Sequence, residues 1–171
     1  MLIRITSGNY RNRTIKTPGG KTHPMGERER LALFNMVSDY IPGARILDAY
    51  AGSGAVGIEA LSRGALEVCF LEKSPTAAKI IRANLADLGL KERVFVGDAT
   101  NFTTPDGFDV ILADPPYDDF DFAGVEYLSG FLKDGGILVL SHPDTPPEIM
   151  GLKMIKTRKY AAAHITVYVK V

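Results

Sequence analysis

Four acidic residues stand at or just after short apolar runs of the sequence. Asp48 lies near the end of the run 45–49, Glu72 ends a second run, Asp98 follows a third and Asp114 follows a fourth. Near-continuous apolar runs are typical of strands in a parallel sheet that is covered on both faces. Open α/β sheets bind their ligands at the edge where the carboxyl ends of such strands meet. The pattern therefore predicts one acidic ligand site at that edge.

The most specific signal is the tetrapeptide Asp-Pro-Pro-Tyr at positions 114–117. An exocyclic amine of a nucleobase is a poor nucleophile because its lone pair is delocalised into the ring. We expect the Asp114 carboxylate and the Pro115 carbonyl to accept its hydrogens, while the rigid Pro115-Pro116 pair holds both acceptors in place. Tyr117 offers a flat face on which an extracted base can stack. The alternative, a plain turn after a strand, does not account for the other three acids.

A glycine-rich segment at 46–57 links the first run to a helical pattern. The spacing Gly52-x-Gly54-x-x-Gly57 is that of dinucleotide-binding turns. An acid just before the turn would repel the pyrophosphate of NAD. Asp48 suits instead the cationic amino-acid and sulfonium end of S-adenosylmethionine. Capping of the following helix is the alternative role for this side chain.

The two following runs are expected to supply the rest of the cofactor site. Glu72 would accept both ribose hydroxyls, and an unengaged acid at a strand end is the alternative interpretation. Asp98 would accept from the adenine amino group, while the Ala99 amide donates to a ring nitrogen. The complete predicted cofactor site contains Asp48, Ala51, Gly52, Ser53, Gly54, Glu72, Lys73, Asp98, Ala99 and Asp114.

The charged residues are unevenly distributed, although 20 Lys/Arg and 20 Asp/Glu balance to zero. Residues 1–30 carry a net charge of +5, residues 149–171 another +5, and the segment between them −10. Basic ends and an acidic centre fit a protein that binds a polyanion with its ends and a cationic ligand in the middle. Ordinary solvated surface charge would give the same composition. The predicted RNA contacts are Arg4, Arg11, Arg13, Lys16, Arg28 and Arg30.

Five apolar runs that alternate with helical patterns or loops predict a doubly wound, mostly parallel sheet. A small hairpin is predicted at 2–16, a helix at 27–40, and an antiparallel pair of strands near the C-terminus. A chain of 171 residues fits one domain, 1–171, with residues 1–24 as a basic hairpin and loop appendage. The predicted strands are 45–49, 68–72, 94–97, 110–113, 137–141, 153–158 and 164–169, and the predicted helices between them are 55–63 and 77–88.

The composition also limits the classes of protein to consider. A single cysteine, Cys69, allows no intrachain disulfide and no cysteine-rich metal site, so we expect a buried packing role. The sequence has no apolar run of the ~18 residues that a membrane span needs, and its start does not resemble a signal peptide. We therefore expect a cytoplasmic protein, and separately we expect it to be a monomer. His142 follows the fifth run within reach of the site, but its expected role is structural, as for His23 and His164, and we expect no metal.

The whole chain resembles the RsmD-type ribosomal RNA methyltransferases, most clearly in residues 47–65. The tetrapeptide 114–117 is shared with several amino-methyltransferase families, including adenine-N6 enzymes. Residues 8–13 resemble the basic hairpin of the family, and residues 23–35 resemble the loop and helix that follow it. The departures from the usual residues are Asn12, His23, Met25, Glu27 and Ser141, the last standing where many members have glutamate.

The resemblance implies a Rossmann-like, seven-stranded methyltransferase sheet with an antiparallel strand near the C-terminus. It also implies methyl transfer from S-adenosylmethionine to the N2 amine of a guanine in bacterial 16S rRNA, with S-adenosylhomocysteine as product. The implied substrate is the small ribosomal subunit or an assembly intermediate, and the hairpin and loop are implied to hold RNA or cofactor. Because so small a chain has little surface with which to specify an RNA site, we hypothesise that ribosomal proteins complete it. An adenine-N6 methyltransferase acting on DNA or RNA is the alternative, and an NAD-binding Rossmann module is a more distant one.

Overall fold

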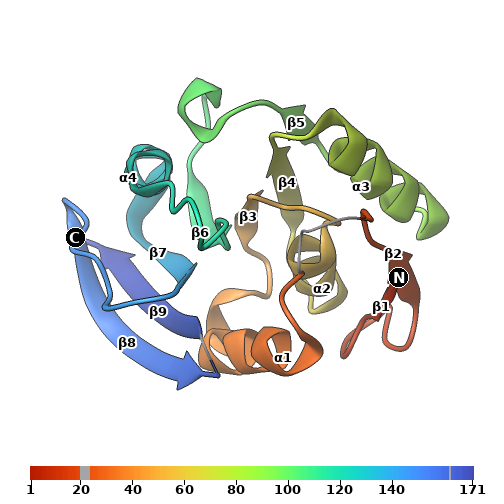
Figure 1. Cartoon of the computed structure of the whole chain (residues 1–171), viewed down its shortest axis with the longest axis horizontal. Helices are drawn as coiled ribbons and strands as arrows, with labels where there is room; N and C mark the ends of the chain where they lie inside the picture. Colours follow the sequence, from red (N-terminus) through yellow and green to blue (C-terminus); the bar gives the residue numbers. More distant parts are fainter. Residues whose placement is uncertain (20–23, 162) are drawn as a thin grey trace.

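Seven strands form one sheet in the computed structural model, which describes residues 1–19, 24–161 and 163–171 (Figure 1). The strand order is β5-β4-β3-β6-β7-β9-β8. Neighbouring strands from β5 to β7 are parallel, and β9 is antiparallel to both β7 and β8. This topology confirms the predicted Rossmann-like sheet. The strands are β3 (Arg45–Ala49), β4 (Glu67–Glu72), β5 (Val94–Val96), β6 (Phe108–Ala113), β7 (Leu132–His142), β8 (Leu152–Tyr160) and β9 (Ala163–Lys170).

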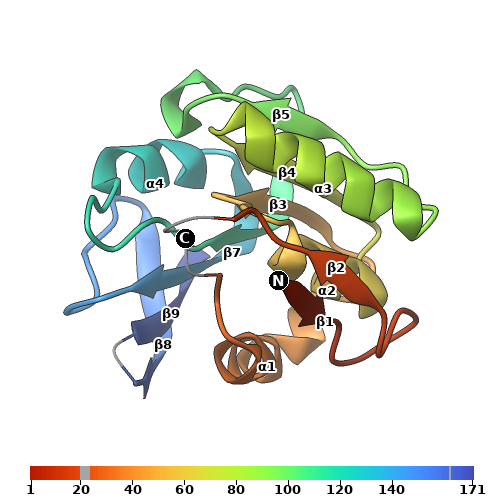
Figure 2. The same ribbon diagram turned by 45° about the vertical axis from the view of Figure 1, so that its right-hand side comes forward.

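Helices cover both faces of the sheet (Figure 2). Because successive side chains of a strand point to opposite faces, Ile46 of β3 joins one buried cluster and Leu47 joins the other. The first cluster includes apolar side chains of α1, α2 and α3, and the second includes those of α4. The strands are therefore apolar on both sides, as their sequence runs predicted. The helices are α1 (Glu27–Met36), α2 (Ala55–Ser62), α3 (Pro75–Asp87) and α4 (Phe122–Ser129), with short 3₁₀ turns η1 (Ser38–Tyr40) and η2 (Ala99–Asn101).

The helix predicted at 27–40 ends earlier than expected. Val37 leaves the helical region with φ −125°, and its N–H donates to the Phe34 carbonyl at 3.3 Å. Val37, Ser38 and Asp39 are all weak helix formers, so the chain tightens into η1 instead of continuing α1. The helical spacing of apolar residues continues past the end of α1 in the sequence because Val37 and Ile41 are buried although they lie outside the helix.

Capping side chains explain two further differences at helix starts. α3 begins two residues earlier than predicted because Ser74 accepts from the Ala77 N–H and Pro75 occupies the first turn. α4 was not predicted as a separate helix. It begins at Phe122, after the capping residue Asp121, whose carboxylate accepts from the Gly124 N–H at 3.0 Å. Its eight residues are too few for a clear periodicity.

The N-terminal hairpin forms its own two-stranded sheet from β1 (Leu2–Arg4) and β2 (Thr14–Lys16). Two apolar side chains of this segment, Ile5 and Ile15, are almost fully buried and belong to the first core cluster of the main sheet. The predicted hairpin is confirmed, although its strands are shorter than the expected runs. Its packing shows that the hairpin shares a core with the sheet.

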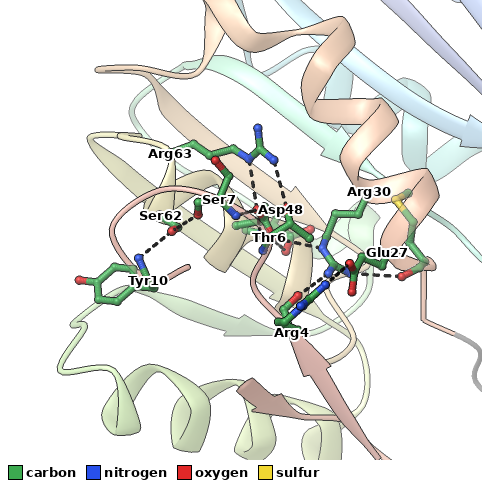
Figure 3. A network of polar contacts seen from close by, with 12 residues as sticks. Arg4, Thr6, Ser7, Tyr10, Glu27, Arg30, Asp48, Ser62 and Arg63 are labelled. Carbon is green, nitrogen blue, oxygen red and sulfur yellow. Dashed lines mark hydrogen bonds and ion pairs between the residues drawn. The ribbon is translucent and has the colours of Figure 1, made fainter. Parts of the chain in front are cut away.

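A network of polar contacts that includes Thr6, Ser7, Arg30 and Arg63 anchors this hairpin to the helices (Figure 3). Glu59 is fully buried and accepts from the backbone N–H groups of Thr6 and Ser7 and from the Thr6 hydroxyl at 2.6–3.2 Å. The guanidinium groups of Arg30 and Arg63 also contact it, at 3.3 and 3.2 Å. One side chain thus joins the hairpin, α1 and α2. A buried charge is tolerated here because it is paired and hydrogen-bonded.

The C-terminal hairpin contains one irregularity, in β8. Met154 pairs with Tyr168, but Lys156 pairs with Val167, so Ile155 is an extra residue on this strand. Such a β-bulge leaves two residues opposite one and changes which side chains share a face. After the bulge, Lys156 and Arg158 pair with Val167 and Ile165 of the first core cluster.

Candidate active site

The acids predicted at the sheet edge do come together there. Asp48 pairs in register with Leu112, two residues before Asp114, and the strand carrying Glu72 lies on its other side. Burial raises the pKa of Asp48 well above its usual range, and the nearby charges of Asp114 and Glu72 raise it further. This edge therefore concentrates negative charge at the carboxyl ends of three adjacent strands.

Asp48 is held by the start of α2. Its Oδ2 accepts from the Gly57 N–H at 2.9 Å, so it does cap the helix, while Oδ1 makes no hydrogen bond with the described residues. Gly57 has no room for a side chain, because a Cβ would lie 2.4 Å from the Phe70 ring and 2.8 Å from Oδ2 of Asp48. The glycine is thus required for the close approach that fixes this carboxylate.

The turn between β3 and α2 is fastened to Glu72. Its Oε2 accepts from the Gly52 N–H at 2.7 Å and its Oε1 from the Ser74 N–H at 2.9 Å. Gly52 has φ +57°, and nothing lies within 4 Å of the place where its Cβ would be. A side chain at this position would meet no neighbouring atom, so steric crowding does not require the glycine. The glycine instead allows the left-handed backbone of the turn and leaves the space beside it free. Glu72 is therefore a fixed acceptor rather than an unengaged acid at a strand end.

The other predicted cofactor residues line the same edge in different ways. Ala51 and Gly54 close the turn through a 2.8 Å backbone hydrogen bond, and Ser53 is buried. Lys73 and Asp98 are exposed and form an ion pair at 3.2 Å. Ala99 is buried at the start of η2, directly after Asp98.

Asp114 lies in a polar cluster that includes an unpredicted partner, Ser141 of β7. Burial raises the pKa of Asp114 to about 6, and a hydrogen bond with the Ser141 hydroxyl acts in the opposite direction. The Ser141 hydroxyl also hydrogen-bonds with the Tyr117 hydroxyl, and burial raises the pKa of that phenol. Pro115 is buried and Pro116 exposed between them. Asp114, Tyr117 and Ser141 thus form one connected group.

Tyr50 is a second residue that sequence reasoning missed. It has φ +58°, which is unusual for a bulky side chain and often marks a functional turn. Its hydroxyl donates to Asp121 Oδ2 at 2.8 Å, so the glycine turn is tied to the start of α4. Burial and this hydrogen bond raise the pKa of Tyr50. Its place next to the glycine turn was visible in the sequence, but its partner 71 residues away was not.

Comparison with known proteins identifies the family. The family model described as conserved hypothetical protein 95 matches residues 3–169. "Ribosomal RNA small subunit methyltransferase D" of Haemophilus influenzae is 34% identical over 67% of this chain and 64% of that protein. The chain belongs to the RsmD-type methyltransferase family. Bacillus subtilis YlbH is 30% identical over 98% of this chain and 99% of its own. The structure of Escherichia coli YhhF superimposes with a TM-score of 0.88 at 27% identity, covering 99% of this chain and 98% of that one.

One basic residue predicted to contact RNA in this RsmD-type chain is not available for that role. Arg30 is only 1% exposed, and its guanidinium contacts Glu59 and donates to the Arg4 and Met25 carbonyls (Figure 3). The prediction for Arg30 is therefore wrong, because its partners inside the fold enclose the charge.

The other predicted RNA contacts are all exposed. Arg4 forms an ion pair with Glu27 at 2.7 Å, and Arg13 donates to the Asp87 carbonyl at 3.1 Å. Both retain exposed guanidinium groups at the hairpin surface. His23, one of the departures noted in the N-terminal loop, lies outside the described residues. The remaining predicted RNA contacts are Arg11, Lys16 and Arg28.

His142 lies next to Ser141 but on the other face of the sheet. It is buried, its Nε2 hydrogen-bonds with the Thr166 hydroxyl at 2.7 Å, and its ring stacks on His164 at 5.5 Å. Burial lowers the pKa of His142. These contacts support the structural role. Among the described residues, no group of three or more His, Cys, Asp or Glu side chains is arranged as a metal site, and no helix is long and apolar enough to span a membrane.

Proposed function

We propose that this RsmD-type protein transfers a methyl group from S-adenosylmethionine to the N2 amine of a guanine in the 16S rRNA of the small ribosomal subunit. The observation that carries the proposal is the partly buried Asp114 carboxylate, which is linked through Ser141 to Tyr117 at the same sheet edge as Asp48 and Glu72. The choice of guanine N2 and of the small subunit rests on the family resemblance.

The donor set at the edge fits S-adenosylmethionine. Asp48 retains one carboxylate oxygen without a partner in the described chain, next to two other negative charges that a cationic ligand would relieve. The open space over Gly52 leaves room for a ligand beside the oriented Glu72 carboxylate. When bound, the cofactor supplies a methyl group on a sulfonium. Lys73, Asp98 and Ala99 would border its adenine end.

The chain's own residues would then prepare the amine. The Asp114 carboxylate and the Pro115 carbonyl accept its two N–H groups, which turns the nitrogen lone pair toward the methyl carbon. Tyr117 supports the base, and its hydrogen bond with Ser141 fixes the ring position. The bound cofactor would supply its methyl group to this nitrogen and leave as S-adenosylhomocysteine, and the methylated nitrogen would then release one proton to solvent. Positioning, rather than strong general-base catalysis, carries such a reaction.

Two alternative functions differ from this proposal, one in its product and the other in the ligand that the site would bind. An adenine-N6 methyltransferase would use the same tetrapeptide, so only the product distinguishes it. An NAD-binding module would place a pyrophosphate at the start of α2, where Asp48 already accepts from the Gly57 N–H at 2.9 Å and the charges of Asp114 and Glu72 lie nearby. The occupied N–H group and the acidic surroundings disfavour that ligand.

The product of methyl transfer tests the proposal directly. Incubation with undermodified small ribosomal subunits and labelled S-adenosylmethionine, followed by digestion to nucleosides, is expected to place label in N2-methylguanosine. Label in N6-methyladenine would favour the alternative enzyme. S-adenosylhomocysteine should raise the melting temperature because it binds the native state, whereas a rise with NAD alone would support the nucleotide module. Comparison of naked 16S rRNA with the particle then tests whether ribosomal proteins complete the substrate.

The rate of methyl transfer is expected to depend on the ionisation of Asp114. The ionised Asp114 carboxylate accepts its hydrogen bond from the amine more strongly than the protonated carboxyl does, and burial raises its pKa to about 6. The kcat should therefore fall as the pH decreases through about 6, with a one-proton slope. Asp114→Asn keeps one acceptor oxygen but no titration, so its slower reaction should show no inflection in this range. A persisting inflection in that variant would assign it to another group.

A further inference from the structure

A basic groove is formed by side chains of α1 and the edge strand β8, two elements whose places in the fold Figure 1 shows. Its volume is about 460 Å³. Arg28 and Asn35 of α1 and Lys156, Arg158 and Tyr160 of β8 supply its polar lining, and the rest is apolar side chains of α1. Among the residues that the structure describes, no acidic side chain lines it. The groove therefore combines three cations, an aromatic ring and an apolar surface.

These cations have no acidic partner among the described residues. Arg28, Lys156 and Arg158 are exposed, and within the described chain none of them forms a salt bridge. Arg30, by contrast, is on the same helix and is paired with a buried carboxylate. Like charges around one groove repel each other, so their grouping favours a polyanionic ligand over a role in folding.

The groove lies close to the proposed catalytic group. Ser141 of β7 pairs with Ile165 of β9, which pairs with Arg158 of β8, so the three residues lie side by side across the sheet. Neighbouring strands are ~4.8 Å apart, which places the backbone of Arg158 roughly 10 Å from that of Ser141. On the α1 side, Glu29 is the sequence neighbour of Arg28. Burial is the largest cause that raises the pKa of Tyr117, and the charge of Glu29 raises it further. Both walls of the groove thus border the site.

We propose that this groove, formed by Arg28, Lys156, Arg158 and Tyr160, binds the phosphate backbone of the RNA strand that carries the target nucleotide. The proposal rests on the proposed function, because an RNA base in the site requires its flanking phosphates to lie nearby. Arginine and lysine would contact phosphates, and Tyr160 offers a face for a neighbouring base. The N-terminal hairpin lies on the opposite side of α1 from β8, and its Arg4 contacts Glu27 of α1, so basic residues would lie on both sides of this helix (Figure 1).

Lysines on an edge strand have another known use, which is to prevent pairing with the edge of a second molecule. If the lysines only prevent edge pairing, a positive charge at any position of β8 would serve, and the groove residues on α1 would have no role. The strand offers a matched comparison, because Lys153 and Lys159 are also exposed but do not line the groove. Two double variants, each losing two charges from the same strand, separate the two explanations.

The test compares Lys156→Ala/Arg158→Ala with Lys153→Ala/Lys159→Ala in methyl transfer to undermodified small ribosomal subunits. The groove variant is expected to raise KM about ten-fold with kcat within two-fold. The slope of log KM against log salt should fall by roughly 1.5, since each phosphate contact contributes about 0.7–0.9. The control variant should stay within two-fold of the wild type in both constants. Affinity for S-adenosylhomocysteine should not change in either variant.

Binding of a fluorescein-labelled single-stranded RNA, followed by anisotropy, tests the groove without methyl transfer. Weaker binding of the groove variant than of the control supports the inference even if the methylated base is not guanine. Equal weakening of both variants would overturn it in favour of general charge. Unchanged binding together with a larger mass by light scattering would overturn it in favour of edge protection. Failure of the wild type to methylate any base of the particle would instead count against the proposed function.

Discussion

Asp114→Ala is expected to lower the rate of methyl transfer by about a hundred- to a thousand-fold, the range measured when one preorganised transition-state contact is removed. The Asp114 carboxylate is the only side chain of the tetrapeptide 114–117 that can accept a strong hydrogen bond from the amine. The Pro115 carbonyl remains in the variant, so some positioning of the base survives. Affinity for S-adenosylhomocysteine should stay within about three-fold, because Asp48 and Glu72 are unchanged.

The same variant is not expected to lose stability. A carboxyl group whose pKa is raised by burial, here from 3.8 to about 6, destabilises the folded state when it is ionised. Its unfavourable contribution is absent below about pH 4 and complete above about pH 6, so removing the group relieves a cost at neutral pH. Thermal melting at pH 7.5 checks this point. Asp119→Ala, in the exposed loop after the tetrapeptide, is the matched control. Wild-type turnover in Asp114→Ala would refute the role assigned to this residue.

Glu59→Ala is expected to have the largest effect on stability, about 3–5 kcal/mol of the free energy of unfolding, as found when one partner of a buried ion pair is removed. The substitution leaves the Arg30 guanidinium buried without its carboxylate and leaves the Thr6 and Ser7 N–H groups without their acceptor. Chemical denaturation at constant pH measures the loss. Glu126→Ala, at an exposed position of α4, should change the free energy by less than about 0.5 kcal/mol.

A double variant separates the charge from the packing at this position. Arg30→Met/Glu59→Leu removes both ions and should recover part of the stability, because no unpaired buried guanidinium remains at position 30. Recovery should be incomplete, since the N–H groups of the hairpin still lack an acceptor. If Glu59→Ala alone costs less than about 1 kcal/mol, the anchoring role of this network is wrong.

The sheet and its acidic edge were predictable because each depends on local pattern. Apolar runs such as 110–113 mark buried strands, and the parallel order brings the residues at their carboxyl ends together. Asp48, Glu72 and Asp114 therefore meet where they were expected. Helix ends were harder to predict, because capping by Ser74 starts α3 two residues earlier than its apolar spacing indicated.

Contacts between distant segments could not be predicted from one sequence. Arg30 looked like a surface cation among other cations, and only the fold shows that Glu59, 29 residues later, encloses it. Ser141 was noted only as a departure from the usual glutamate, yet its hydroxyl joins Asp114 to Tyr117. The pairing of Tyr50 with Asp121 depends in the same way on where α4 lies.

The extra residue in β8 also affects how the length of this strand can vary among relatives. Loss of Ile155 would remove the bulge while leaving Met154 opposite Tyr168 and Lys156 opposite Val167. Loss of Thr157 would instead transfer the following side chains to the opposite face of the sheet, because side chains alternate along a regular strand. A relative that is one residue shorter in this strand can therefore be aligned with its gap at position 155, where every cross-strand pair stays unchanged. A gap placed after position 155 would assign the wrong residues of β8 to the face beside α1.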